Sequence, residues 1–247
     1  MDDRFLASRL ADLARVSDNR DIFTFSDFLS PSEAALTAGA AGRTPFTAWG
    51  GMEGCERVVV RFGDEDRIGY EADFPICVIR VSPQNAKFAD HLTHRDFLGA
   101  LMHLGIERST VGDILIRDNT AWIFALEQIA PFIAGELRAV RHTPVTCEVT
   151  DQVPEEVIPK REPETLNIPS LRLDALIARL YHLPRGKAKD LFAAQLIFVN
   201  GNTCLNESFQ PKEGDVISAR GYGKFVFTGI EGETRKGRIM ACVEVYR

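Results

Sequence analysis

Apolar residues along this chain recur at helical and at strand-like spacings, and the alternation between the two predicts its elements. Residues 5–14 repeat apolar side chains every three or four positions, which predicts an amphipathic helix. A second helix is expected from Ser30–Pro31 towards residue 39, because serine and proline favour a helix start. The run 58–62 predicts a short strand. These elements form a first, small α/β module over residues 1–70.

A regular alternation of strands and helices defines the second module, residues 71–150. The expected order is strand 76–81, helix 93–104, a hairpin of strands 111–116 and 120–126, helix 129–140 and strand 145–149. Strand-helix-strand-strand-helix-strand is the order of the ferredoxin-like plait, which RNA-recognition modules also use. We therefore expect a ferredoxin-like (RRM-like) middle module, with RNA binding among the roles that this fold serves.

Residues 151–169 hold four prolines and several glutamates, a composition that buries little surface, so they predict an extended linker. The third module, 170–247, begins with a helix lined by Leu173, Leu176, Ile177 and Leu180. A second helix and short strands follow, with a hairpin turn at Asn200–Gly201. The fold class expected for the whole chain is α+β.

Charge separates the last module from the rest. The 247-residue chain has a net charge of −6, yet residues 171–247 carry twelve Lys and Arg against eight Asp and Glu. A basic module on an acidic protein suggests a polyanionic partner, and nucleic acid is the first candidate. No apolar run approaches a membrane span, and the acidic N-terminus does not resemble a signal peptide. Five scattered cysteines without a CxxC pair favour a reducing cytoplasm.

The candidate RNA contacts are basic side chains of this last module. Arg185, Lys187 and Lys189 lie near the start of the second helix, whose free N–H groups favour phosphate. The full set of predicted RNA-binding residues is Arg172, Arg185, Lys187, Lys189, Asn200, Arg220, Lys224, Lys236 and Arg238. The alternative interpretation is that the cations form only a solvated face, and that turn geometry accounts for Asn200. Asp174 is expected to support the hairpin by pairing with a nearby arginine.

No catalytic or cofactor signature stands out elsewhere. His94–Arg95–Asp96 lacks the glycine-rich loop that would accompany it in a kinase, and the histidines have no metal-ligand spacing. The sequence therefore predicts no metal, no cofactor and no enzymatic activity. Trp122 and Phe124 alternate on one strand, which leaves open whether they stack on bases or pack in a core.

Several segments of the third module resemble the S4 RNA-binding domain in order and spacing, and further segments resemble the YlmH family of bacterial proteins. The S4-like segments are 171–174, 185–189, 199–201 and 214–217, and the YlmH-like ones are 220–225, 234–238, 94–101, 104–106, 112–114, 49–51 and 56–57. One departure is Pro184–Arg185–Gly186, where S4 domains often have Ser-Arg-Ser.

The resemblance implies a C-terminal S4 (αL-like) domain that binds structured RNA, namely 23S ribosomal RNA or tRNA in the large ribosomal subunit. It also implies a non-enzymatic role in the quality control of translation. Two other interpretations remain: an RNA-modifying enzyme of the pseudouridine synthase kind that uses S4 for substrate binding, or a protein-interaction adaptor.

Overall fold

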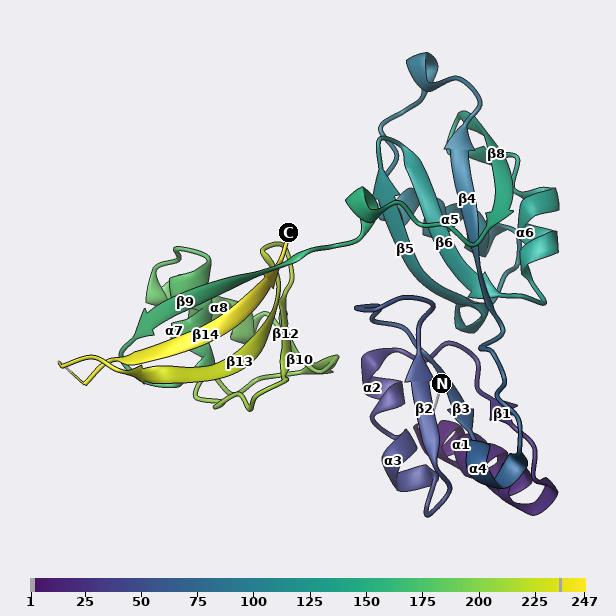
Figure 1. The fold of residues 1–247 in the computed structure, drawn as a ribbon. Coiled ribbons are helices and arrows are strands. Elements are labelled where there is room, and N and C mark those ends of the chain that lie inside the picture. The colour runs from purple at the N-terminus through teal and green to yellow at the C-terminus, as the bar shows by residue number, and fades with distance from the viewer. Residues whose placement is uncertain (1–2, 236) are drawn as a thin grey trace. The chain divides into compact units, whose positions relative to one another are not determined.

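The computed structural model describes residues 3–235 and 237–247, in two compact units that span Met1–Ile158 and Pro159–Arg247 (Figure 1). The first unit contains two sheets and the second contains one. Within the described ranges, no helix combines the length and apolar character that a bilayer crossing requires. All five cysteines are free thiols.

The N-terminal part of the first unit packs a long helix on a small sheet. Its elements are α1 (Asp3–Arg20), β1 (Thr24–Phe25), α2 (Pro31–Ala34), α3 (Thr37–Ala40), β2 (Phe46–Trp49), β3 (Val59–Phe62) and α4 (Glu65–Ile68), with sheet order β1-β3-β2. Leu6 and Leu10 of α1 are buried against Phe62. The predicted start at Ser30 is confirmed by a capping box, in which the Ser30 N–H donates to Glu33 Oε2 at 2.7 Å. The single helix expected here is instead two one-turn helices.

A five-stranded antiparallel sheet with two helices forms the rest of the first unit. The elements are β4 (Ile76–Pro83), α5 (His94–His103), β5 (Val111–Arg117), β6 (Thr120–Leu126), α6 (Ala130–Glu136), β7 (Ala139–Val140) and β8 (Thr143–Thr150), with 3-10 turns at Ala86–Phe88, Arg108–Thr110 and Glu155–Val157. The strand order β5-β6-β4-β8-β7 gives the ferredoxin-like arrangement that the element order predicted. The expected helix 129–140 ends earlier, because Leu137 leaves helical geometry (ψ 92°) and Val140 is buried in β7.

Both faces of this sheet carry packed apolar side chains, although Arg80 on the second face is 49% exposed. Ile79 and Ile123 pack with the α5 and α6 side chains Phe97 and Ile133 on one face. On the other face, Trp122 and Phe124 share a buried cluster with Phe28, from the segment after β1, and Val59 of β3, joined by Val153 and Val157. Trp122 is 7% exposed and Phe124 0%. The two aromatic residues are therefore core, and base stacking on them is excluded.

The second unit builds a six-stranded antiparallel sheet around two helices. Its elements are β9 (Arg161–Ile168), α7 (Leu173–Leu180), α8 (Arg185–Ala193), β10 (Ile197–Val199), β11 (Asn202–Thr203), β12 (Val216–Ala219), β13 (Gly223–Glu233) and β14 (Ile239–Tyr246), in the order β11-β10-β12-β13-β14-β9. The predicted turn between β10 and β11 is confirmed, with positive φ at Asn200 (49°) and Gly201 (79°).

The expected linker 151–169 is wrong in its second half, because residues 161–168 form β9 along β14. β9 is an edge strand, where a proline such as Pro163 and a charged face are tolerated. Leu166 and Ile168 are buried, while Glu162 and Glu164 pair with Arg247 at 2.9 and 3.2 Å. The sequence pattern did not predict this strand, because it contains a proline and several charged residues and its apolar residues lie only at its end.

Candidate functional site

The helical hairpin of α7 and α8 presents its basic residues on the side opposite to the core. In α7, Leu173, Leu176 and Ile177 are fully buried, and α8 buries Ala188 and Phe192. The apolar positions follow the helical period, so the intervening positions face outward. The sequence thus determines which side of the hairpin carries charge.

A buried carboxylate organises two of the predicted cations. Asp174 has no exposed side-chain surface, and it accepts two hydrogen bonds from Arg172, from Nε to Oδ1 at 2.9 Å and from NH2 to Oδ2 at 3.0 Å. The Arg185 Nε donates to Asp174 Oδ2 at 3.4 Å. Burial raises the pKa of Asp174, but the hydrogen bond and charge of Arg172, with Arg185, outweigh it and lower the pKa overall. The expectation that Asp174 supports the hairpin through an arginine is confirmed.

A hollow of about 450 Å³, lined by both cationic and apolar side chains, lies beside this cluster. It brings the predicted Arg185 and Arg238 together with Arg179 and His182, and its lining holds no carboxylate. Arg238 is held in place by β9, because its side chain donates to the Asn167 Oδ1 and to the Asn167 carbonyl oxygen, the latter at 3.0 Å. The hollow therefore collects cationic donors, and Asp174, the acid that pairs with Arg185, lies outside its lining.

The sequence reasoning missed Arg179 and His182, although a signal for them existed. Arg179 is on α7 and His182 lies two residues past its end, and the small α7 residues Ala175 and Ala178 also line the hollow. Ala175 and Ala178 are three positions apart, as are Arg179 and His182. On a helix, small side chains at such spacing leave room for a hollow, and neighbouring cations can then line it. A charge count along the chain does not detect it.

The remaining predicted residues have different surroundings. Lys187 is exposed on α8, and the Lys189 Nζ pairs with Glu207 Oε2 at 2.6 Å. The Arg220 guanidinium lies 4.6 Å from the centre of the Phe198 ring, and the Lys224 ammonium lies 4.0 Å from that of Tyr246. These four cations are thus not part of the hollow that holds Arg185 and Arg238.

Asn200 has a local structural task. Its amide nitrogen donates to Asp215 Oδ1 at 2.8 Å, and its Oδ1 accepts from the Val216 N–H at 2.9 Å. These bonds join the β10–β11 turn to the start of β12, so they use both ends of the side chain. Lys236, also predicted, lies outside the described residues.

No metal site accompanies these residues. Across residues 3–235 and 237–247, no three His, Cys, Asp or Glu side chains gather as metal ligands would. What the second unit offers chemically is a set of guanidinium and ammonium donors, of which two are held by a buried carboxylate and one by β9. Such donors bind phosphate and carboxylate groups.

Two family models match the chain. Residues 171–217 match the S4 domain, so the unit that carries the hairpin is that of an S4-domain protein. Residues 70–153 match a model described as "Putative RNA-binding domain in YlmH". The chain is therefore a YlmH-like protein with a C-terminal S4 domain. The hollow joins residues of the S4 match to Asn167, Pro169 and Arg238, which lie outside it.

One curated protein and one solved structure are similar to this chain. The chain is 28% identical over 244 residues to the ribosome-associated protein quality control protein P2 of Bacillus subtilis (strain 168), covering 96% of this chain and 93% of the relative. Among solved structures, the cell division protein ylmH from Streptococcus pneumoniae superposes with a TM-score of 0.50 at 22% identity, over 61% of this chain and 92% of that one. The latter is a likeness of fold.

Proposed function

We propose that this chain is a non-enzymatic RNA-binding protein that docks on structured ribosomal RNA or tRNA through its S4 unit. We further propose that it acts with the large ribosomal subunit in the quality control of translation, in the cytoplasm. The match to an S4 domain and the name of the Bacillus relative support this role. The observation that carries the proposal is the acid-free hollow where Arg179, Arg185 and Arg238 converge.

Physical chemistry explains why such a surface suits folded RNA. Guanidinium groups bind phosphate oxygens with charge-assisted hydrogen bonds, and each neutralised phosphate releases counterions. Phosphates look alike in every sequence, so selectivity comes from the shape of the RNA backbone. Arginines held by Asp174 and Asn167 lose less conformational freedom when they bind, which favours a defined RNA shape.

The test compares full-length protein with a variant that combines Arg179→Gln, Arg185→Gln and Lys187→Gln. Lys212→Gln is the matched control, since Lys212 is an exposed lysine of the same unit, on the turn before β12. Co-sedimentation with large ribosomal subunits is measured across a salt series. We expect the triple variant to lose binding and to show a shallower salt dependence, because the slope of log K against log salt falls by roughly 0.7–0.9 for each phosphate that is no longer neutralised.

If the triple variant and the control sediment equally with the large subunits, the proposal that the S4 unit binds RNA is refuted. For the non-enzymatic part of the proposal, the measurement is mass spectrometry of ribosomal RNA and tRNA from cells with and without the gene. We expect the same set of modified nucleotides in both. A modification that disappears with the gene would show an RNA-modifying enzyme instead.

A further inference from the structure

In the middle of the first unit, the aromatic side chains of the sheet face are not available to RNA. Ferredoxin-like RNA-binding modules commonly use the open face of their sheet, where aromatic side chains stack on bases. Here Phe28 and Val59 pack against the aromatic residues of that face, which are buried. Base stacking on this sheet is therefore not available, and the side that carries α5 and α6 is the next surface to consider.

Charge is unevenly distributed over this region. Residues 70–153 hold seven Lys and Arg against eleven Asp and Glu, so the region is acidic overall. Three of the seven cations, Arg95, Arg138 and Arg141, nevertheless line a single hollow of about 500 Å³. Arg108 and Arg117 donate to backbone carbonyls elsewhere. An acidic domain that gathers three of its seven cations at one place has a local electrostatic footprint that suits an anion.

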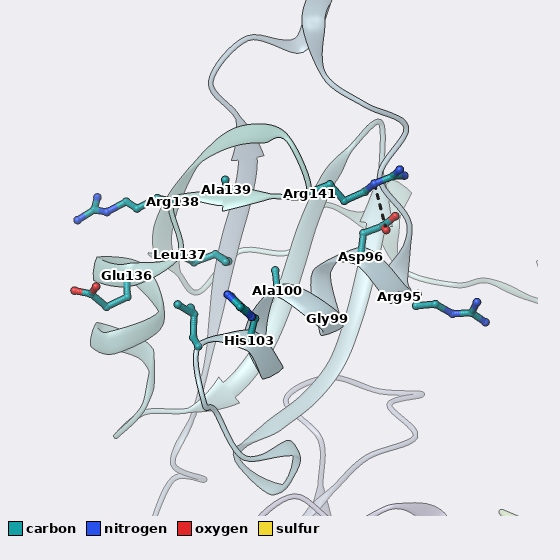
Figure 2. A pocket seen from close by; sticks show the side chains of 11 residues that line it. Arg95, Asp96, Gly99, Ala100, His103, Glu136, Leu137, Arg138, Ala139 and Arg141 are labelled. Carbon is teal, nitrogen blue, oxygen red and sulfur yellow. Dashed lines mark ion pairs between the residues drawn. The ribbon is translucent and has the colours of Figure 1, made fainter.

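The geometry of this hollow spreads the cations around a shallow centre. Figure 2 shows Arg138 on one side and Arg95 and Arg141 on the other, with Gly99 and Ala100 between them. A Cβ at Gly99 would meet no atom within 4 Å, so the centre is open. Cations on opposite rims of an open hollow suit an extended polyanion better than a single small anion.

The two acids of the lining do not cancel this charge. The Asp96 carboxylate accepts from the Thr93 N–H at 2.9 Å and from the Thr93 hydroxyl at 2.6 Å, which caps α5, and the hydrogen bonds from Thr93 lower its pKa. Arg141 lies 3.8 Å from it, a loose pair that leaves the guanidinium half exposed. Glu136 extends outward at the rim. Within the described chain, neither Arg95 nor Arg138 has an ion pair.

We propose that the hollow lined by Arg95, Arg138 and Arg141 binds the phosphate backbone of structured RNA, as a second contact besides the S4 unit. This inference rests on the proposed function and adds a location to it. It assigns RNA contact in the region 70–153 to the helix side, and it predicts contacts to phosphates rather than to bases.

The experiment uses full-length protein and large-subunit ribosomal RNA freed of its proteins, with binding measured across a salt series. The test variant is Arg95→Gln/Arg138→Gln. The control is Arg80→Gln, an arginine of β4 in the same unit, 49% exposed and loosely paired with Glu148 at 4.0 Å. We expect the double variant to lower the slope of log K against log salt by about 1.4–1.8, from 0.7–0.9 per phosphate, while the control keeps the wild-type slope.

A lysine variant, Arg95→Lys/Arg138→Lys, guards against a folding effect, because it keeps the charges that phosphates require. It should restore most of the slope. An S4 variant, Arg185→Gln/Lys187→Gln, is measured alongside. If the S4 variant loses binding and the Arg95→Gln/Arg138→Gln variant keeps the wild-type slope, this inference falls and the proposed function stands. If neither variant differs from wild type, both fall.

Discussion

Replacing the buried Asp174 with asparagine should loosen the S4 hairpin. Asp174→Asn keeps the side-chain volume but removes the charge that holds Arg172 at 2.9 and 3.0 Å and Arg185 at 3.4 Å. A hydrogen bond to a charged group contributes about 1.5–3 kcal/mol, and breaking a buried ion pair costs about 3–5 kcal/mol. Arg172 and Arg185 are 30% and 55% exposed, so solvent screens part of this. We expect the free energy of unfolding to fall by about 2–3 kcal/mol.

Hydrogen exchange of the amides in 173–193 is the suitable assay, because both tryptophans lie in the first unit and do not report on this hairpin. A loss of about 2–3 kcal/mol corresponds to exchange faster by about 30- to 150-fold. Asp190→Asn, an exposed acid on α8, is the control and should leave exchange unchanged. If Asp174→Asn exchanges at the wild-type rate, the carboxylate does not hold the hairpin.

The same pair gives a pH dependence with a definite sign. The pKa of Asp174 is lower in the folded protein than its ordinary value of 3.8. A carboxyl group of this kind stabilises the fold above its unfolded-state pKa, and the stabilisation is lost as the pH falls through the folded-state pKa. The difference in exchange between wild type and Asp174→Asn should therefore be full near neutral pH and should shrink below about pH 4. A difference that stays constant down to strongly acidic pH contradicts the argument.

Three further predictions concern the first unit. Gly112→Ala places a Cβ 2.6 Å from the buried ring of Phe28, so the free energy of unfolding should fall by about 1–3 kcal/mol. Urea unfolding followed by tryptophan fluorescence measures this, and Gly99→Ala, where a Cβ meets no atom within 4 Å, should not lower the midpoint. Trp122→Ala should cost about 3–5 kcal/mol of stability in calorimetry, and unchanged stability would mean that Trp122 is not core. Burial raises the pKa of the Cys147 thiol to about 11, so alkylation at pH 8, followed by mass spectrometry, should be about a hundredfold slower than for a thiol of pKa 9; an equal rate would contradict this.

Local patterns of the sequence predict much of the fold. The strand and helix order of 76–150 follows from the spacing of apolar residues, and the turn at Asn200–Gly201 follows from residues that accept positive φ. The partner of Asp174 was also predictable, since a buried acid two residues from an arginine requires a counter-charge.

Features that depend on distant segments were not predictable in this way. β9 is stabilised as a strand by its pairing with β14, some 80 residues later in the chain, and its own residues have the composition of a linker. Trp122 is buried by Phe28 and Val59, and nothing in its strand indicates that cover. The S4-unit hollow is also lined by Asn167 and by Arg238, which come from outside the hairpin; Arg238 was predicted from its charge, but nothing in the sequence indicated that Asn167 holds it beside the hairpin.

Ultraviolet cross-linking of the protein to RNA in cells, followed by mass spectrometry of the cross-linked peptides, tests the central claim most directly. The account predicts cross-links to large-subunit ribosomal RNA or tRNA in peptides that contain Arg179, Arg185 or Arg238, which line one hollow. Cross-links confined to peptides outside that hollow, or no RNA recovered with the protein, would contradict it.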